Sequence, residues 1–508
     1  MNSPQDAYAE LTKELREIAV LSSIGSVLHW DERTVRPPAG AEHRASQVSL
    51  IATMTHARFT SLRIGEWLAA VEASDLVRDP HSDTAVNVRY TRRSYDRATK
   101  LPPALVEELA RTSSLSEHAW ESAKKNSDFK SFAPWLSKII ELKRAEADCI
   151  APGKNRYDAL LDEYEPGETS ANLRVVFEAL HGPLVELVGK ITSSGRKAPT
   201  EILERHYPAE AQEKLAREAA AAIGFDFNAG VLARSVHPFC TSLGPGDTRM
   251  TTRYDERYFG DAFFGTLHES GHSLYDQGLP AEHFGLPRGE YVSLGIHESQ
   301  SRMWENLVGR SRSFWKYFLP KAREAFPKAL SAGTHGVTED QWYFAVNDIR
   351  PSLIRTEADE ATYNLHVLMR FELEQALLVG DLPVNDLPAE WNMRMQKYLG
   401  LTPPDDARGC LQDVHWSGGG IGYFPTYTLG NLYAAQFFEQ ARKDLGDLDA
   451  MITNGEFAPL LGWLRKNIHT HGKTYTAGEL AQRVTGKPLS PLPLLSHLER
   501  KGAELYAI

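Results

Sequence analysis

The sequence predicts an all-α, mainly helical protein with a small β element next to one central helix. Apolar residues recur at three- and four-residue spacing through most of the chain, which is the period of an amphipathic helix. One stretch near the middle instead carries extended segments around a turn. With 508 residues, 42% of them hydrophobic and 24% charged, the chain can bury a large core, although length alone leaves the number of domains open.

The first half of the chain, from about residue 4 to residue 224, is predicted to consist of stacked helices. The N-terminus alternates polar and apolar positions and carries acidic residues early, which indicates an amphipathic helix rather than a secretory signal. Proline and glycine predict helix ends at three places, namely residues 36–40, 101–103 and 165–167. None of these breaks is long enough to be an interdomain linker.

The β element is predicted within residues 233–254, where two short antiparallel strands, 235–239 and 248–254, flank the turn Gly-Pro-Gly-Asp. Helical spacing then returns in two segments joined by a loop: a helix over 260–277, a loop over 278–289 and a helix over 290–309. Helices resume beyond Pro351. They are interrupted by residues 416–425 (WSGGGIGYFP), which we interpret as an active-site loop.

Charge and cysteine content exclude several classes of protein. The net charge of −11 and the lack of a dense Lys/Arg run give no attraction for phosphate backbones, so no nucleic acid partner is expected. The three cysteines are far apart and form no CxxC pair, which argues against a disulfide framework and a thiolate zinc site. No stretch is apolar enough to span a membrane. We expect a cytoplasmic protein.

Residues 268–272 form an HExxH motif, His-Glu-Ser-Gly-His. On a helix, His268 and His272 lie one turn apart on one face, with a rise of about 6 Å between them, so both imidazoles can reach one ion. Glu269 then points at the open coordination position and can take a proton from an ion-activated water. An apolar stripe supports this helix: Phe264, Leu267, Gly271 and Leu274.

A third protein ligand is needed to complete such a site. Asp276 is excluded, because about 12 Å of helix separates it from His268. We predict Glu298, on the next helix, as the third ligand. Glu290 and Glu282 are weaker candidates in or beside the connecting loop, and Glu305 is expected on the helix surface or as a carboxylate behind the ligands.

Several motifs together resemble the carboxypeptidase Taq family of metallocarboxypeptidases, in matching order and spacing over nearly the whole chain. The elements that carry the resemblance are His237-Pro238-Phe239 (HPF), Asp247 to Thr251 (DxRxT), His268 to His272 (HExxH), His297 to Gln300 with Glu298 as third ligand, Ile354 to Asp359 (IRxxAD) and Gly409 to Trp416 (GxxQDxHW). The segment Leu28-His29-Trp30-Asp31 also resembles the family's start. Arg36 stands where the family has a methionine.

The resemblance implies a saddle-like zincin fold with a deep substrate groove and a single domain over residues 1–508. Residues 1–230 would form the helical groove wall, and residues 231–508 would carry the metal site. It further implies one divalent metal per chain, zinc first and cobalt second. The expected protein is a homodimer that releases C-terminal amino acids from peptides with broad specificity.

Four further residues are assigned to the reaction. Arg355 is predicted to bind the substrate's terminal carboxylate, because a guanidinium offers a planar pair of donors; the alternative is an i, i+4 ion pair with Asp359 on one helix. His415 and Tyr423 are predicted to donate to the developing oxyanion, or else to be packed structural groups. His237 is predicted to contact substrate or support the metal, or else to be a strand-end histidine.

Two other functions compete with a metallocarboxypeptidase. An oligopeptidase would use the same residues to cut short peptides internally. A non-catalytic helical scaffold would hold a structural metal, but such a metal needs four protein ligands and no spare base, which Glu269 would be. Asp247, Arg249, Gln412 and Asp413 are expected to form supporting contacts.

Overall fold

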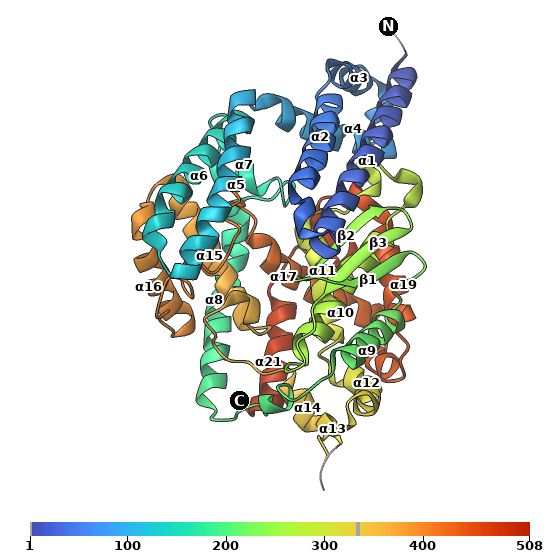
Figure 1. Cartoon of the computed structure of the whole chain (residues 1–508). Coiled ribbons are helices and arrows are strands. Elements are labelled where there is room, and N and C mark those ends of the chain that lie inside the picture. Colours follow the sequence, from blue (N-terminus) through green and yellow to red (C-terminus); the bar gives the residue numbers. More distant parts are fainter. Residues whose placement is uncertain (1–2, 332–335) are drawn as a thin grey trace. The chain divides into compact units, whose positions relative to one another are not determined.

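The computed structural model describes residues 3–331 and 336–508, and its helical architecture confirms the predicted fold class (Figure 1). The helices are α1 (Pro4–Thr34), α2 (Ala41–Phe59), α3 (Leu62–Glu72), α4 (Asp83–Lys100), α5 (Pro103–Asn126), α6 (Phe129–Ile150), α7 (Arg156–Leu161), α8 (Ser170–Ser193), α9 (Ala209–Ala222), α10 (Gly260–Asp276), α11 (Leu294–Arg302), α12 (Arg312–Ala325), α13 (Pro327–Leu330), α14 (Glu339–Ala345), α15 (Thr362–Val379), α16 (Leu387–Leu399), α17 (Pro425–Leu445), α18 (Leu448–Thr453), α19 (Ala458–Asn467), α20 (Ala477–Thr485) and α21 (Leu492–Tyr506). The strands are β1 (Gly230–Arg234), β2 (Phe239–Gly244) and β3 (Asp247–Thr252).

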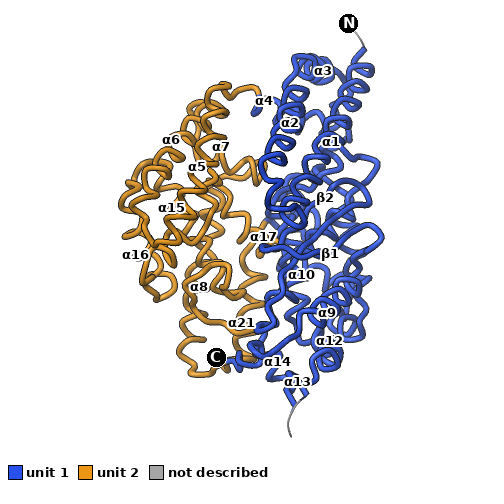
Figure 2. Tube along the Cα trace, in the orientation of Figure 1, with its two compact units in different colours: residues 1–98, 198–346, 434–488 blue, residues 99–197, 347–433, 489–508 orange. Residues whose placement is uncertain are grey.

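The chain divides into two compact units, coloured separately in Figure 2. Unit 1 comprises residues 1–98, 198–346 and 434–488, and it contains the sheet and the HExxH helix. Unit 2 comprises residues 99–197, 347–433 and 489–508. It contains the glycine-rich loop, which begins at residue 416 and ends at residue 424, before α17. Each unit is built from segments far apart in the sequence, so the predicted division into residues 1–230 and 231–508 does not match the boundaries of these units.

The predicted helix breaks are confirmed. Helix α1 ends at Thr34, and residues 38–40 form a short 3-10 turn before α2. Helices α4 and α5 meet at the proline pair 102–103, and α7 and α8 are separated by the segment that contains Pro166 and Gly167. The first helix is amphipathic as expected, with buried residues spaced three or four apart at Ala7, Leu11, Leu15 and Ile18.

The β element has three strands, so the prediction of two was wrong. Strand β3 lies in the centre, with β1 parallel to it on one side and β2 antiparallel on the other. Leu232 and Cys240 both pair with Met250, whose side chain is fully buried. The predicted strand 235–239 lies mostly in the connection between β1 and β2, whereas the turn 244–247 is where the sequence placed it.

The sheet and an aromatic cluster fix helix α10. The hydroxyl of Ser270 approaches the Met250 sulfur at 3.4 Å, which places the helix against β3. At the start of the helix, the ring of Phe263 stacks on Phe259 and packs against Trp315, with centroids 5.1 and 5.2 Å away. The predicted apolar stripe of α10 is buried, and the helical period places His268 and His272 beside it.

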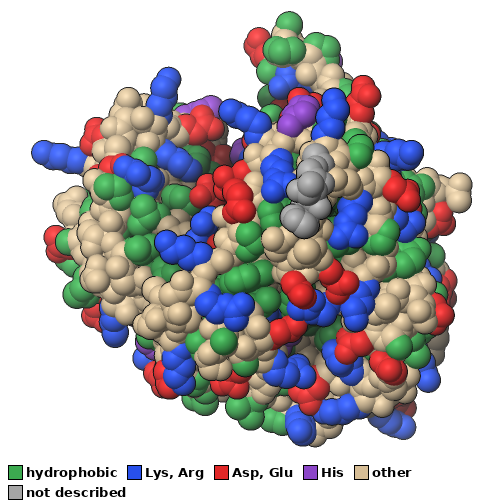
Figure 3. Space-filling model, turned by 90° about the horizontal axis from the view of Figure 1, so that it is seen from below, with side chains coloured by type: hydrophobic (Ala, Val, Ile, Leu, Met, Phe, Trp, Pro, Cys, Tyr) green, Lys and Arg blue, Asp and Glu red, His purple; other side chains and the backbone are tan. Residues whose placement is uncertain are grey.

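The surface agrees with the composition. On the face shown in Figure 3, Lys and Arg side chains are interspersed with Asp and Glu, and the described residues drawn there form no extended basic patch. Cys149, Cys240 and Cys410 are free thiols, as their spacing predicted. No helix within residues 3–331 and 336–508 combines the length and apolar character needed to cross a membrane.

Candidate active site

Helices α10 and α11 approach each other closely because of Gly271, the fourth residue of HExxH. A β-carbon at this position would lie 2.5 Å from the backbone oxygen of Gln300 and 2.5 Å from the Cα of Ser301, both on α11. Any side chain would therefore push the helices apart. The glycine thus allows a carboxylate on α11 to reach the two histidines of α10.

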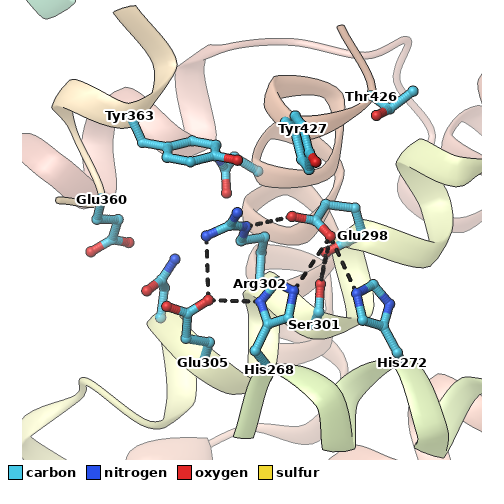
Figure 4. Close-up of polar contacts among 12 residues, drawn as sticks. His268, His272, Glu298, Ser301, Arg302, Glu305, Glu360, Tyr363, Thr426 and Tyr427 are labelled. Carbon is cyan, nitrogen blue, oxygen red and sulfur yellow. Dashed lines mark hydrogen bonds and ion pairs between the residues drawn. The ribbon is translucent and has the colours of Figure 1, made fainter. Parts of the chain in front are cut away.

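That carboxylate belongs to Glu298, the residue expected from the sequence as the third ligand. Its Oε2 atom lies 3.3 Å from Nε2 of His272 and 3.7 Å from Nε2 of His268. The three candidate ligand atoms lie within 4.8 Å of one another. Figure 4 shows both imidazoles rising from α10 toward this carboxylate. Two imidazole nitrogens and one carboxylate oxygen form a donor set that suits a catalytic zinc with an open position.

Arg302 leaves only one oxygen of Glu298 available to an ion. Its Nε donates to Oε1 of Glu298 at 2.7 Å, while the other oxygen, Oε2, faces the histidines and accepts from the Ser301 hydroxyl at 3.1 Å (Figure 4). The guanidinium also donates from Nη1 to Oε2 of Glu305 at 3.3 Å. Arg302 therefore orients two carboxylates at once.

Glu305 lies behind His268. The sequence left two positions open for it, the helix surface and a position behind the ligands, and the structure shows the second. Its Oε2 is 2.9 Å from Nδ1 of His268, so the carboxylate favours the tautomer with hydrogen on Nδ1 and leaves Nε2 free to bind an ion. Burial alone would raise the pKa of Glu305, but Arg302 and His268 outweigh it and lower the pKa to about 2. Glu305 stands in a π-helix, Met303–Val308, that continues directly from α11. Such segments are frequent at functional sites.

Glu269, the expected base, is buried on α10 with 7% of its surface exposed. Burial raises its pKa to about 7, against the opposing effect of His268 and with a further contribution from Glu298. A carboxyl group with a pKa near neutral can both accept and return a proton at physiological pH.

The other acidic candidates lie elsewhere. Asp276 accepts from Nε2 of His297 at 3.1 Å and is not among the clustered ligand atoms, as its distance along the helix predicted. Glu290 pairs with Lys473, and Glu282 is an exposed residue of a 3-10 turn. His237 is exposed in the β1–β2 connection, where its backbone oxygen accepts from the Ser235 hydroxyl at 2.6 Å.

Arg355 belongs to a buried charge cluster within unit 2. Its Nε and Nη2 donate to Oδ1 of Asp413 at 2.9 and 2.8 Å, and its Nη1 donates to the Tyr363 hydroxyl at 2.8 Å. Arg370 donates to the other oxygen of Asp413 at 2.7 Å. The alternative ion pair with Asp359 was wrong, because residues 355–357 form a 3-10 turn rather than an α-helix.

His415 and Tyr423 lie close together in unit 2, with ring centroids 5.3 Å apart. Nε2 of His415 is 3.2 Å from the hydroxyl of Tyr427. Burial lowers the pKa of His415 to about 4, although Asp413 opposes this, so the ring is neutral at pH 7 and carries one N–H donor. Tyr423 packs edge-on against Tyr164 with centroids 5.2 Å apart.

The sequence interpretation missed Arg302, Arg370 and Tyr427. Arg302 could have been found, because it stands four residues after Glu298 on a predicted helix, which is the spacing of a helical ion pair. Arg370 and Tyr427 meet their partners across 43 and 12 residues of chain, and no local pattern marks either contact. The supporting role expected for Asp413 and Gln412 is confirmed, since Gln412 accepts from the Arg355 backbone N–H at 2.9 Å.

Comparison with known proteins bears on this geometry. The family model described as carboxypeptidase Taq (M32) metallopeptidase matches residues 10–502. Thermostable carboxypeptidase 1 of Thermus thermophilus is 49% identical, with 99% of this chain and 100% of that protein covered. Carboxypeptidase 1 of Bacillus subtilis is 39% identical, with 97% of both chains covered.

The fold is shared as well. The crystal structure of an M32 carboxypeptidase from Deinococcus radiodurans R1 matches with a TM-score of 0.95 at 40% sequence identity, covering 99% of this chain and 100% of that one. A carboxypeptidase from Pyrococcus furiosus matches with a TM-score of 0.93 at 34% identity, covering 99% of both chains. The chain therefore belongs to the carboxypeptidase Taq (M32) family of metallopeptidases.

Proposed function

We propose that this protein is a metallocarboxypeptidase that releases C-terminal amino acids from peptides with broad specificity. The observation that carries the proposal is the convergence of His268, His272 and Glu298 within 4.8 Å, with the buried carboxyl group of Glu269 on the same helix as the histidines. The ligands fit zinc, and cobalt is the alternative. When bound, the ion would polarise the scissile carbonyl and activate the attacking water.

The protein's own residues supply the remaining steps. Glu269 takes the proton of the attacking water and delivers it to the leaving amine, a role that its pKa of about 7 permits. His415 and Tyr423 donate hydrogen bonds to the negative charge that develops on the carbonyl oxygen. Support for His415 comes from its neutral state, which retains an N–H donor, and from its place in the family motif.

Substrate selection is assigned to Arg355 and His237. The three hydrogen bonds that Arg355 makes to Asp413 and Tyr363 leave two of the five guanidinium hydrogens for a substrate carboxylate. The exposed ring of His237 is proposed to contact the peptide. We further propose a cytoplasmic homodimer acting as one domain over residues 1–508. Three free cysteines support the reducing compartment, and the dimer is proposed from the motif resemblance alone.

The decisive experiment digests a peptide ladder with the zinc-loaded protein and analyses the products by mass spectrometry. Stepwise loss of C-terminal residues is expected, and a matched peptide with a C-terminal amide should be cut far more slowly. Equal cleavage of the amide would indicate an oligopeptidase. The variant Glu269→Gln should retain the metal and lose about 10²–10⁴-fold in kcat. Unchanged turnover in this variant would rule out the mechanism, and no turnover by the wild type would favour the scaffold.

A further inference from the structure

Glu374, on α15, holds the glycine-rich loop of residues 416–424 at two points. Its side chain is fully buried. Oε1 accepts the indole N–H of Trp416 at 2.9 Å, and Oε2 accepts the backbone N–H of Gly422 at 3.2 Å. The Tyr157 hydroxyl donates to Oε2 at 2.8 Å. All four residues belong to unit 2.

The two anchored residues are the chain neighbours of the two side chains proposed to stabilise the oxyanion. Trp416 follows His415, and Tyr423 follows Gly422. A displacement of either anchor therefore moves one of these side chains. The loop has little stiffness of its own, because it contains four glycines, and two of them have positive φ angles of 81° and 87°.

A carboxylate suits this position better than an amide. It accepts all three hydrogen bonds, whereas an amide would present an N–H to at least one of these donors. Keeping it buried is costly: burial raises the pKa of Glu374 to about 7, although Trp416 and Tyr157 oppose the rise. The hydrogen bonds from Trp416, Gly422 and Tyr157 offset this cost, so the buried carboxylate and the loop stabilise each other.

We propose that Glu374 is a positioning residue, which fixes the glycine-rich loop so that His415 and Tyr423 hold the geometry needed in the transition state. The inference rests on the proposed function. Glu374 reaches the loop through its hydrogen bonds with Trp416 and Gly422. The Tyr157 hydroxyl, on α7, donates to the same carboxylate and holds it in place.

The test compares Glu374→Gln with Glu372→Gln. Glu372 stands on the same helix but pairs with Arg394 and Tyr398, so it controls for the loss of a carboxylate from α15. In the zinc-loaded enzyme, Glu374→Gln should lower kcat by about 10- to 100-fold, because small misplacements of transition-state groups have effects of this size. Its KM should stay within about threefold. The control should change neither constant.

Hydrogen exchange at the Gly422 amide is the second readout. Its exchange should accelerate at least about tenfold in Glu374→Gln and stay unchanged in Glu372→Gln. Equal kcat values for the two variants, an effect confined to KM, or unchanged Gly422 exchange would overturn the proposal. Should Glu374→Gln fail to fold, Trp416→Phe serves as the second variant, because it removes one donor to the carboxylate. It should show a smaller fall in kcat and a smaller acceleration of Gly422 exchange. The absence of both effects would overturn the proposal. A wild type without peptidase activity would refute the proposed function, while Gly422 exchange would still test the anchoring.

Discussion

Glu305→Gln tests whether the carboxylate behind His268 contributes to metal binding. Glu305 accepts from Nδ1 of His268 at 2.9 Å and from Arg302 at 3.3 Å, and 13% of its side chain is exposed. The amide removes the negative charge and can turn an N–H toward Nδ1, which opposes the tautomer that leaves Nε2 free. Loss of such a partner costs about 10- to 100-fold in metal affinity, or about 1.4–2.8 kcal/mol.

The assay is a competition titration of metal-free protein against a chromophoric zinc chelator at constant pH and salt. Glu290→Gln is the control, because Glu290 pairs with Lys473 and half of its side chain is exposed. The control should bind zinc as the wild type does. Circular dichroism should show that both variants keep their helices. Wild-type affinity in Glu305→Gln, or the same loss in both variants, would refute the role assigned to Glu305.

Asp413→Asn leaves two buried guanidinium groups without their shared anion, so the free energy of unfolding should fall by about 3–5 kcal/mol, and an unchanged urea midpoint would contradict this. Burial raises the pKa of Asp413, but Arg355 and Arg370 outweigh it and hold the pKa well below its usual range. Its stabilising effect is therefore present above the unfolded pKa of about 3.9 and is lost as the pH falls, so Tm should drop in acid more steeply for the wild type than for Asp413→Asn. Gly422→Ala should cost about 1 kcal/mol more than Gly446→Ala in urea titrations, because both positions have positive φ but only the first places a β-carbon 2.9 Å from a backbone nitrogen. Equal losses would contradict this.

The features predicted correctly are those that local spacing encodes. The helical period alone places His268 and His272 on one face, and it excludes Asp276 as the third ligand because of its distance along the helix. The same period does not extend to Glu305, which stands in the π-helix that follows α11, although Glu298 and Glu305 both contact histidines of α10. It does not reveal that Glu305 reaches Nδ1 of His268, since that contact depends on how α10 and α11 pack.

The features that were missed depend on contacts across the chain. Strand β1 pairs with β3 in parallel, and a parallel pair needs no tight turn that would mark it in the sequence. Asp359 stands four residues after Arg355, but the segment is not α-helical. Asp359 instead accepts the backbone N–H groups of Ala361 and Thr362 at the start of α15. Arg355 consequently pairs with Asp413, 58 residues further along the chain.

This cluster is compatible with the proposed contact between Arg355 and the substrate's terminal carboxylate. Arg355 shares the Asp413 carboxylate with Arg370 and pairs with no second carboxylate among the described residues, so its charge is only partly compensated in a buried environment, where uncompensated charge is costly. The rings of Tyr363 and Tyr427, 5.6 and 5.0 Å from the Arg355 guanidinium carbon, offset part of that cost. A peptide's terminal carboxylate offers the missing negative charge, and an internal segment offers none. Losing a buried charge partner costs about 2–5 kcal/mol, so amidation of the substrate should lower kcat/KM by about thirtyfold or more. A smaller effect would mean that Arg355 serves the fold and not the choice of cleavage site.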